Sequence, residues 1–340
     1  MHISGRRSGD DGMKFGLRLP SYAWPDATYE QVRLLGGYAR RAEEVGFASL
    51  WVIEHLLVSP ALYAVAWHDP FAVLAHVAAV TERVRLGTAI LVLPLRHPVI
   101  VAREVLTLDF LSGGRFILGV GTGWEEREFA SVGIPLKERG ARLDEGLEVI
   151  RRLVSEKSVT HHGRFFTLDD VSMEPRPPRP PEIWIAGGSL GHAPETPDKP
   201  YIAPKVLDRI AGADGWMSRS SGSDAGMVKA DWVVVQEHMR AIGRDPRSLT
   251  FAHTQFVHIS EAPTRERAIA EQGPHFARVM GDHRGFEDLA ASYLMGTIDD
   301  IQHRIADLAA VGLQELIITP VADDPRQLDL LATHVIGPFG

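Results

Sequence analysis

The sequence predicts an α/β fold, a single (β/α)8 barrel with insertions, and three observations lead to that prediction. Short apolar runs rich in β-branched residues alternate with longer stretches in which apolar residues recur at helical spacing. The connections between them are short, which is typical of a parallel sheet with helices outside it. Eight strands follow one another without a linker-like boundary, so we expect one domain over 13–340.

Local signals place the elements in chain order. The strands are expected at 15–19, 49–53, 85–91, 115–120, 182–186, 213–217, 250–260 and 315–319, and the helices at 28–45, 70–80, 98–111, 140–155, 225–242, 264–280 and 298–311. Asp69 followed by Pro70 caps the second helix, and the Ser-Gly-Gly run at 112–114 stops the third. The Gly-Pro pair at 273–274 must kink or end the helix that contains it.

Other segments break this alternation. Residues 159–171 alternate about a glycine and predict a surface hairpin, and the proline-rich stretch 175–181 predicts an extended bridge. The proline-rich residues 190–204 have no periodicity, so we expect a loop or lid there. The polar, glycine-rich residues 1–12 lack the apolar core of a signal peptide and are expected to form a disordered leader.

Composition excludes several classes of function. The chain of 340 residues has no cysteine, which excludes disulfides, thiolate nucleophiles and cysteine-ligated metals. The net charge of −8 argues against a nucleic-acid partner. No apolar run approaches the roughly 20 residues of a membrane span. We therefore expect a cytoplasmic protein that acts on a small molecule.

The strongest candidate for chemistry follows the second predicted strand. The strand 49–53 is short and apolar, as a buried parallel strand should be, and Glu54 and His55 come directly after it. In α/β barrels the carboxyl ends of the strands form the mouth of the barrel, where the catalytic residues lie. The His55 imidazole suits proton transfer or the holding of an anionic intermediate, and Glu54 is a candidate to orient it or tune its pKa. The alternative is a loop histidine with no task.

Two glycine-rich loops follow other predicted strands. The Gly-Val-Gly-Thr-Gly run at 119–123 lets backbone amides approach a ligand closely, and Thr122 adds a hydroxyl; the alternatives are a tight turn and a dinucleotide-binding loop. Gly187, Gly188 and Ser189 follow the fifth strand. Two such loops at one mouth favour an anion, most simply a phosphate tail. No spacing of histidines or carboxylates indicates a metal site.

Aromatic and apolar residues accompany these loops. Trp124 follows the run at 119–123 and Trp216 follows Gly215, so either indole could wall an aromatic cofactor or pack against residues 190–204. The apolar segment 56–67 contains no acidic residue, and we expect it to shape a substrate pocket.

Several motifs together resemble one family. They are Met13-Lys-Phe-Gly16, Gly46-Phe-Ala-Ser-Leu-Trp-Val-Ile-Glu-His55, Gly87-Thr-Ala-Ile-Leu-Val-Leu-Pro94, Leu108-Asp-Phe-Leu-Ser-Gly-Gly-Arg-Phe116 leading into Gly119-Val-Gly-Thr-Gly-Trp124, and Ala213-Asp-Gly-Trp216. Taken together, these motifs make the sequence similar to the bacterial luciferase-like superfamily of flavin- and deazaflavin-dependent barrel oxidoreductases, which it resembles more than any single motif would show. The resemblance runs from residue 13 to about 188 with few gaps, and more loosely to the end of the chain.

The resemblance implies where the redox ring of a cofactor binds. His55 takes the place of the luciferase α-chain histidine that supports the flavin intermediate and proton transfer, with Glu54 beside it. The bond between Ala89 and Ile90 falls where the family often has a non-prolyl cis peptide under the isoalloxazine ring. Trp216 belongs to a family signature and is assigned to the cofactor site.

The resemblance also implies where the cofactor phosphate binds. Gly187–Ser189 lie where the family holds the flavin phosphate, and Thr122 and Gly215 complete the predicted cofactor-binding set. The luciferase α chain has Cys-Arg where this chain has Gly121-Thr122, so the arginine contact with the phosphate must be supplied otherwise. The Gly-Thr-Gly-Trp form is more similar to deazaflavin-type members of the family.

Two enzymatic readings follow from the resemblance. The first is a two-component monooxygenase that takes reduced FMN from a separate NAD(P)H flavin reductase and oxygenates a small organic substrate. The alternative is a hydride-transfer oxidoreductase that uses the deazaflavin coenzyme F-420. A third reading is a flavin-binding protein without catalysis, against which His55 and the glycine loops argue. The resemblance further implies a homodimer, and places specificity in residues 190–204 and 274–296.

Overall fold

The computed structural model describes residues 12–20, 22–23, 28–58, 63–189, 192–193, 196–218, 221–281, 284–322 and 324–340. The predicted leader lies outside the described residues except for Gly12, and so do parts of the segment 190–204. Among the helices within those ranges, none combines the length and the apolar character needed to cross a membrane.

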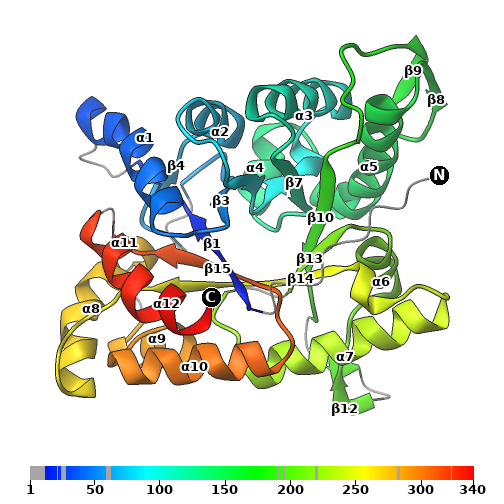
Figure 1. Cartoon of the computed structure of the whole chain (residues 1–340). Coiled ribbons are helices and arrows are strands. Elements are labelled where there is room, and N and C mark those ends of the chain that lie inside the picture. Colours follow the sequence, from blue (N-terminus) through cyan, green and yellow to red (C-terminus); the bar gives the residue numbers. More distant parts are fainter. Residues whose placement is uncertain are drawn as a thin grey trace.

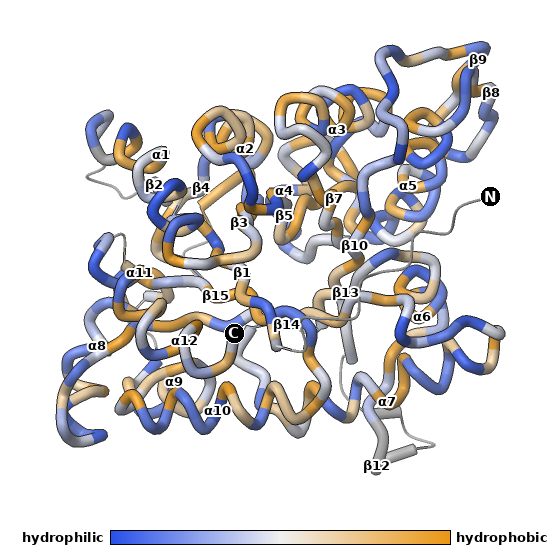
Figure 2. The backbone as a smooth tube through the Cα atoms, viewed as in Figure 1, coloured by the Kyte–Doolittle hydropathy of each residue, from blue (hydrophilic) through white to orange (hydrophobic). Residues whose placement is uncertain are grey.

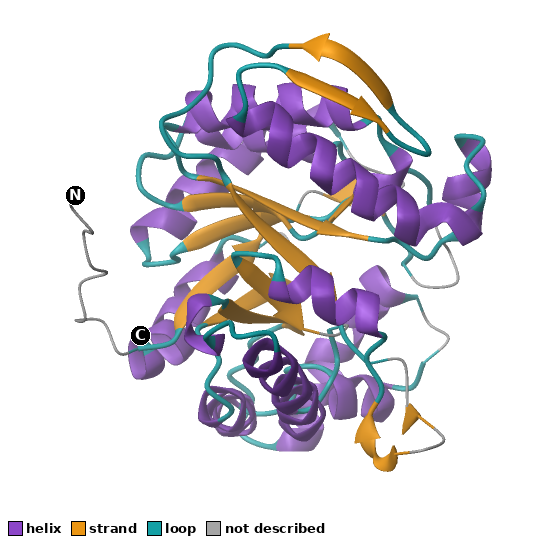
Figure 3. Cartoon of the chain, turned by 90° about the vertical axis from the view of Figure 1, so that its right-hand side faces the viewer, coloured by secondary structure: helices purple, strands orange, loops and turns teal. Residues whose placement is uncertain are grey.

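Eight parallel strands form a closed barrel, which confirms the predicted fold (Figure 1). They are β1 (Lys14–Arg18), β3 (Ser49–Val52), β5 (Arg85–Thr88), β7 (Phe116–Gly121), β10 (Glu182–Gly187), β13 (Gly215–Ser218), β14 (Thr250–Val257) and β15 (Glu315–Pro320). Each pairs with the next, and the pairing of β1 with β15 closes the ring. Figure 3 shows this sheet at the centre with the helices outside it.

The seven predicted helices lie close to their expected positions, and five shorter ones accompany them within the described residues. They are α1 (Tyr29–Glu44), α2 (Pro70–Ala78), α3 (Pro98–Ser112), α4 (Glu126–Ser131), α5 (Arg139–Ser155), α6 (Pro204–Ala211), α7 (Ala225–Ala241), α8 (Arg265–Met280), α9 (Phe286–Ser292), α10 (Ile298–Ala310), α11 (Arg326–Leu331) and α12 (Gly337–Phe339). The expected surface hairpin is present as β8 (Val159–His162) and β9 (Thr167–Val171).

Three local features differ from the expectations. The predicted strand 85–91 is interrupted, because β5 ends at Thr88 and β6 (Leu91–Val92) begins after a cis peptide bond. The short helices α4, α6, α9, α11 and α12 were not predicted, since three to eight residues carry little periodicity. Part of the segment 190–204 forms a two-stranded hairpin, β11 (His192–Ala193) with β12 (Thr196–Pro200). Helix α8 spans the predicted range and does not end at Pro274, and the ring of Phe286 fills the space beside Gly273.

Large indoles inside the barrel are matched by glycines on the neighbouring strand. Trp51 lies beside Gly87 in the register of β3 and β5, and a Cβ at Gly87 would lie 2.2 Å from that indole. Trp184 lies beside Gly215 in the same way, and a Cβ there would lie 2.5 Å from the Trp184 ring. Without these glycines the two tryptophans, whose ring centroids are 5.1 Å apart, would not fit in the barrel. The apolar residues concentrate along the strands in Figure 2.

A buried carboxylate lies among these indoles at the amino ends of the strands, which form the floor of the barrel. Glu315, the first residue of β15, accepts hydrogen bonds from the Ser49 hydroxyl and, at 3.2 Å, from the Trp51 indole N–H. Burial raises the pKa of Glu315, and its hydrogen bonds together with the charge of Arg85 oppose that rise. The floor of the barrel is thus built around an acid that holds its proton more tightly in the folded chain than in the unfolded one.

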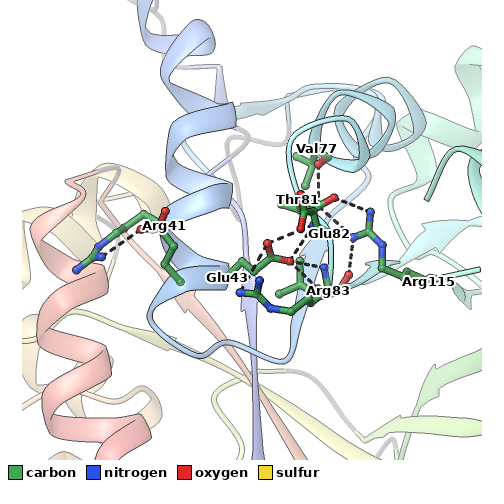
Figure 4. A network of polar contacts seen from close by, with 9 residues as sticks. Arg41, Glu43, Val77, Thr81, Glu82, Arg83 and Arg115 are labelled. Atoms are coloured by element: carbon green, nitrogen blue, oxygen red, sulfur yellow. Dashed lines mark hydrogen bonds and ion pairs between the residues drawn. The ribbon is translucent and has the colours of Figure 1, made fainter. Parts of the chain in front are cut away.

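A second network ties α1 to the same end of the barrel (Figure 4). The Glu43 carboxylate accepts hydrogen bonds from three successive amides, 82–84, just before β5. Burial would raise the pKa of Glu43, but these amides hold it below its usual range. Arg115 donates to the carbonyl of Val84 at 2.8 Å. The residues that lead into β5 are therefore held from two sides, by Glu43 and by Arg115.

The buried acid of the floor gives the first prediction. Because its pKa is raised in the folded state, the stability that Glu315 contributes is present below its unfolded pKa and is lost as the pH rises. Glu315→Gln keeps an acceptor for Ser49 and Trp51 without the buried charge. We expect this variant to be at least as stable as the wild type at pH 8, with the advantage shrinking toward pH 4. Thermal melts over this pH range measure it.

Glu315→Ala is the matched control. It leaves two buried donors without an acceptor and should lower the free energy of unfolding by about 1–3 kcal/mol at every pH. A Gln variant that is as unstable as the Ala variant at pH 8 would show that the ionised carboxylate stabilises the floor.

Candidate functional site

His55 lies at the carboxyl end of β3 and is held by a carboxylate from another element. Its Nδ1 is 3.2 Å from Oε1 of Glu128, which lies on α4. The same oxygen accepts the amides of Leu56 at 2.8 Å and Leu57 at 3.3 Å. Both side chains are secluded, with 10% of His55 and 2% of Glu128 exposed. Glu128 therefore orients the imidazole and the loop that follows it.

This contact fixes which nitrogen of the ring carries the proton. An ionised carboxylate can only accept, so the proton of the neutral His55 imidazole lies on Nδ1. Nε2 is then left as a proton acceptor. A carboxylate behind the ring also stabilises the imidazolium that forms when Nε2 takes up a proton. The pair is suited to moving one proton at the mouth of the barrel.

Glu54, which we expected to orient His55, has a different task. Its Oε1 accepts the Arg96 guanidinium at 2.7 Å and its Oε2 accepts the amide of Val92 at 2.6 Å. Burial raises the pKa of Glu54, and the Arg96 charge and the Val92 amide oppose that rise. The backbone amide of Glu54 donates to the carbonyl of Ile90 at 3.3 Å. Glu54 thus holds residues 90–92 on both sides, and the expected orienting role belongs to Glu128.

The peptide bond that Glu54 helps to hold, Ala89–Ile90, is cis, as the resemblance predicts. Ala89 is buried in the barrel interior, whereas Ile90 and Ala186 are only partly buried. Gly121 provides the room for Ile90, because a Cβ there would lie 2.6 Å from the end of that side chain. These residues form a small apolar surface with no charged side chain of its own, which fits the face of a flat aromatic ring.

Aromatic side chains surround the imidazole. The centroids of Tyr63, Trp124 and Trp67 lie 5.5, 6.1 and 6.2 Å from that of His55. Burial raises the pKa of Tyr63 to about 12, so its hydroxyl keeps its proton. Trp124 is half-exposed, with 52% of its surface accessible. Tyr63 and Trp67 thus bring part of the segment 56–67, which we expected to shape a substrate pocket, beside His55, while 59–62 lie outside the described residues.

The predicted phosphate loop is already engaged by protein groups. The indole N–H of Trp216 donates to the carbonyl of Gly187 at 2.8 Å, and the Ser189 amide donates to the Asp231 carboxylate at 2.9 Å. A buried carboxylate at this position disfavours a second anion beside that amide. Gly188 and Thr122 are partly buried and remain the members of the predicted set that suit a phosphate.

Gly215 and Trp216 are not brought together with His55. Gly215 begins β13, at the opposite end of the strand from the mouth, and accommodates Trp184. Trp216 is fully buried between the sheet and α7, stacked on Phe251 with ring centroids 5.1 Å apart. Its influence on the mouth passes through the hydrogen bond to Gly187 described above.

Glu128 was missed because it lies in a short helix with no distinctive motif. The signal that could have found it is a carboxylate a few residues after a glycine-rich strand end, two strands along the barrel from the strand that precedes His55. No cluster of three metal-ligating side chains occurs within the described ranges.

These features define a (β/α)8 barrel with a carboxylate-bound histidine and an apolar platform at the carboxyl ends of its strands. The sequence profile of the luciferase-like monooxygenase family matches residues 13–195, more than half of the chain, and the protein belongs to this family. The chain is 40% identical over 163 residues to an F420-dependent glucose-6-phosphate dehydrogenase of Kineococcus radiotolerans, which covers 46% of this chain and 47% of that protein. The chain spans about half the length of the curated relatives it matches.

Solved structures match over nearly the whole chain. The monooxygenase RslO1 from Streptomyces bottropensis is 25% identical, with a TM-score of 0.76 over 96% of this chain and 99% of that one. An F420-dependent secondary alcohol dehydrogenase, solved with an F420–acetone adduct, has the same TM-score at 19% identity, over 96% of this chain and 98% of that one. At 19% identity, the likeness to the alcohol dehydrogenase shows only that the two proteins share a fold.

The contact between Glu128 and His55 gives the second prediction. Glu128→Ala removes the acceptor of two amides and of the imidazole, so we expect the free energy of unfolding to fall by about 1–3 kcal/mol. Nitrogen-15 NMR of labelled histidine should show the Nδ1-protonated form of His55 in the wild type and a mixture in the variant. Glu126→Ala, an exposed change on the same helix, is the control and should alter neither quantity. A wild-type His55 protonated on Nε2 would contradict the assigned geometry.

Proposed function

We propose that the protein is an oxidoreductase that transfers a hydride between a deazaflavin coenzyme and a small organic substrate with a hydroxyl or carbonyl group. The observation that carries the proposal is the hydrogen bond from His55 Nδ1 to Glu128, which leaves Nε2 as a proton acceptor. Oxidation of an alcohol needs such an acceptor, because a proton leaves the oxygen as a hydride leaves the carbon. The residue before His55 contacts the Ala89–Ile90 platform through its amide, which donates to the Ile90 carbonyl.

The residues present fit the ring of a deazaflavin or a flavin. Ala89, Ile90 and Ala186 offer an apolar surface for its face, and Trp124 is placed to cover its edge. When bound, the deazaflavin supplies a two-electron hydride acceptor or donor. Gly188 and Thr122 are the groups of this chain proposed to hold its phosphate.

The chain's own residues account for the proton. His55 Nε2 takes the hydroxyl proton of the substrate during oxidation and returns it to the carbonyl oxygen during reduction. Glu128 keeps the ring in the required orientation and stabilises its charged form. The aromatic residues around His55 exclude water from the transfer.

The comparisons support the deazaflavin over FMN. Relatives at 38–40% identity, which match 44–46% of the chain, are named F420-dependent glucose-6-phosphate dehydrogenases. The Gly-Thr-Gly-Trp form of the loop before Glu128 agrees with this choice. The deazaflavin-dependent oxidoreductase, which was the alternative reading of the sequence, is therefore preferred to the FMN-dependent monooxygenase.

The second candidate is the monooxygenase that uses reduced FMN from a flavin reductase. The observation that favours it is the likeness to RslO1 along almost the entire chain. The aromatic residues around His55 would also serve this reaction, which requires a dry site.

Cofactor selection is the direct test of the proposal. We expect the purified protein to bind the oxidised deazaflavin at least ~10-fold more tightly than FMN, measured by quenching of tryptophan fluorescence. It should reduce the deazaflavin with one of two alcohols taken from the names of its relatives, glucose 6-phosphate or 2-propanol. Tighter binding of FMN, with oxygen uptake that depends on NADH and a flavin reductase, would establish the monooxygenase instead.

His55 gives the third prediction about single residues. His55→Ala should keep its melting temperature within a few degrees, because the side chain lies at a strand end outside the main core. Turnover should fall ~10²-fold or more, the scale of a lost acid–base group. His162→Ala, on the exposed hairpin, is the control and should keep full turnover. Turnover of His55→Ala close to that of the wild type would remove His55 from the mechanism.

A further inference from the structure

A cationic side chain faces the barrel interior at the carboxyl end of β1. Side chains alternate along a strand, and Leu17 and Leu19 lie in the outer core, whereas Gly16 faces the indole of Trp51 inside the barrel. Arg18 therefore points inward, and only 9% of it is exposed. Its charge is felt by Tyr63, whose pKa it lowers against the effect of burial.

The next strand presents a hydroxyl at the same level. In β15, Ile318 belongs to the outer core and Ile317 to the interior cluster, so Thr319 points inward. The register pairs Leu17 with Ile318, which places Arg18 beside Thr319. Thr319 is fully buried, and its Oγ1 has no hydrogen-bond partner within the described part of the protein.

Apolar side chains adjoin this polar pair. Phe256 on β14 is paired in register with Thr319 and faces Tyr63, with ring centroids 6.3 Å apart. Tyr63 in turn lies 5.5 Å from His55. A molecule that reaches from the imidazole to Arg18 would thus pass along aromatic rings. The mouth combines a proton acceptor, an apolar wall and a positive charge in that order.

A buried hydroxyl that makes no hydrogen bond destabilises the folded protein, so one in a native site calls for a ligand or a water. A guanidinium pairs best with the two oxygens of a carboxylate or phosphate, and an adjacent hydroxyl can donate a further bond. A neutral alcohol would satisfy Thr319 but would gain nothing from the charge of Arg18. The pair therefore matches an oxyanion.

We propose that Arg18 and Thr319 bind an oxyanion group, a carboxylate or a phosphate, on the substrate whose other end reaches His55. The inference rests on the proposed function in one respect, namely that the substrate occupies this mouth. It adds the chemical class of that substrate: an organic molecule with an oxidisable or reducible carbon at one end and a negatively charged group at the other.

Binding of matched anionic and neutral probes tests the inference without turnover. The probes are benzoate against benzamide, for a carboxylate on an apolar body, and glucose 6-phosphate against glucose, for a phosphate. Calorimetry on the wild type should give at least one anion that binds ~10-fold or more tightly than its neutral counterpart, as a charged hydrogen bond of about 1.5–3 kcal/mol implies. Which pair shows the preference identifies the oxyanion.

Substitutions of Arg18 and Thr319 test whether these two residues cause the preference for the anionic probe. Arg18→Met should abolish it, Arg18→Lys should keep part of it, and Thr319→Val should weaken anion binding roughly 3–10-fold. Arg247→Met, a change at an exposed arginine, is the control and should have no effect. Equal binding of anion and neutral probe by the wild type, or an unchanged preference in Arg18→Met, overturns the inference.

Cofactor titration separates this outcome from failure of the proposed function. If wild type and Arg18→Met bind the deazaflavin equally, the proposed function stands whatever the probes show. If Arg18→Met loses deazaflavin binding and the wild type shows no anion preference, Arg18 serves the cofactor and the inference is wrong. If the wild type binds neither deazaflavin nor FMN, the proposed function fails by itself.

Discussion

One carboxylate oxygen organises the mouth of this barrel. Oε1 of Glu128 contacts the His55 imidazole and two consecutive amides, and so ties the loop after β3 to α4, which follows β7. Strands β3 and β7 are not neighbours, since β5 lies between them. The contact therefore spans the loop in which Ala89 and Ile90 lie. The direction of the imidazole, its protonated nitrogen and the path of residues 56–57 all depend on this one group.

The barrel buries carboxylates at both ends and stabilises them in different ways. At the floor, Glu315 is surrounded by hydroxyl and indole donors, and its raised pKa favours the protonated form. At the mouth, Glu54 faces the Arg96 guanidinium, which also pairs with Asp69 at 2.6 Å, the residue that caps α2. Burial raises the pKa of Glu54 as well, but here a full positive charge opposes the rise. The first arrangement fills the barrel, whereas the second holds a loop in register.

Much of the fold could be predicted from the sequence, because strand and helix periodicities are local properties. The eight strands, the cap at Asp69 and the hairpin around 159–171 were predicted for that reason.

The partners of the catalytic candidates could not be predicted, since they depend on which loops meet. Glu54 is adjacent to His55 in sequence, yet both residues follow the end of β3, and the carboxylate of Glu54 pairs with Arg96 instead of the imidazole. Glu128, 73 positions away, meets the imidazole instead. Side chains alternate along a strand, so Trp216 faces α7 whereas its neighbour Gly215 faces the barrel interior.

The central claim is that Glu128 presents the Nε2 atom of His55 to a redox ring lying on Ala89–Ile90. A crystal structure of the protein with bound deazaflavin tests this claim most directly. The account predicts that the ring lies against Ala89 and Ile90, with the His55–Glu128 hydrogen bond intact and Nε2 facing the space above the ring. A ring bound away from this platform, or an imidazole that has turned from Glu128 to present Nδ1, would contradict it.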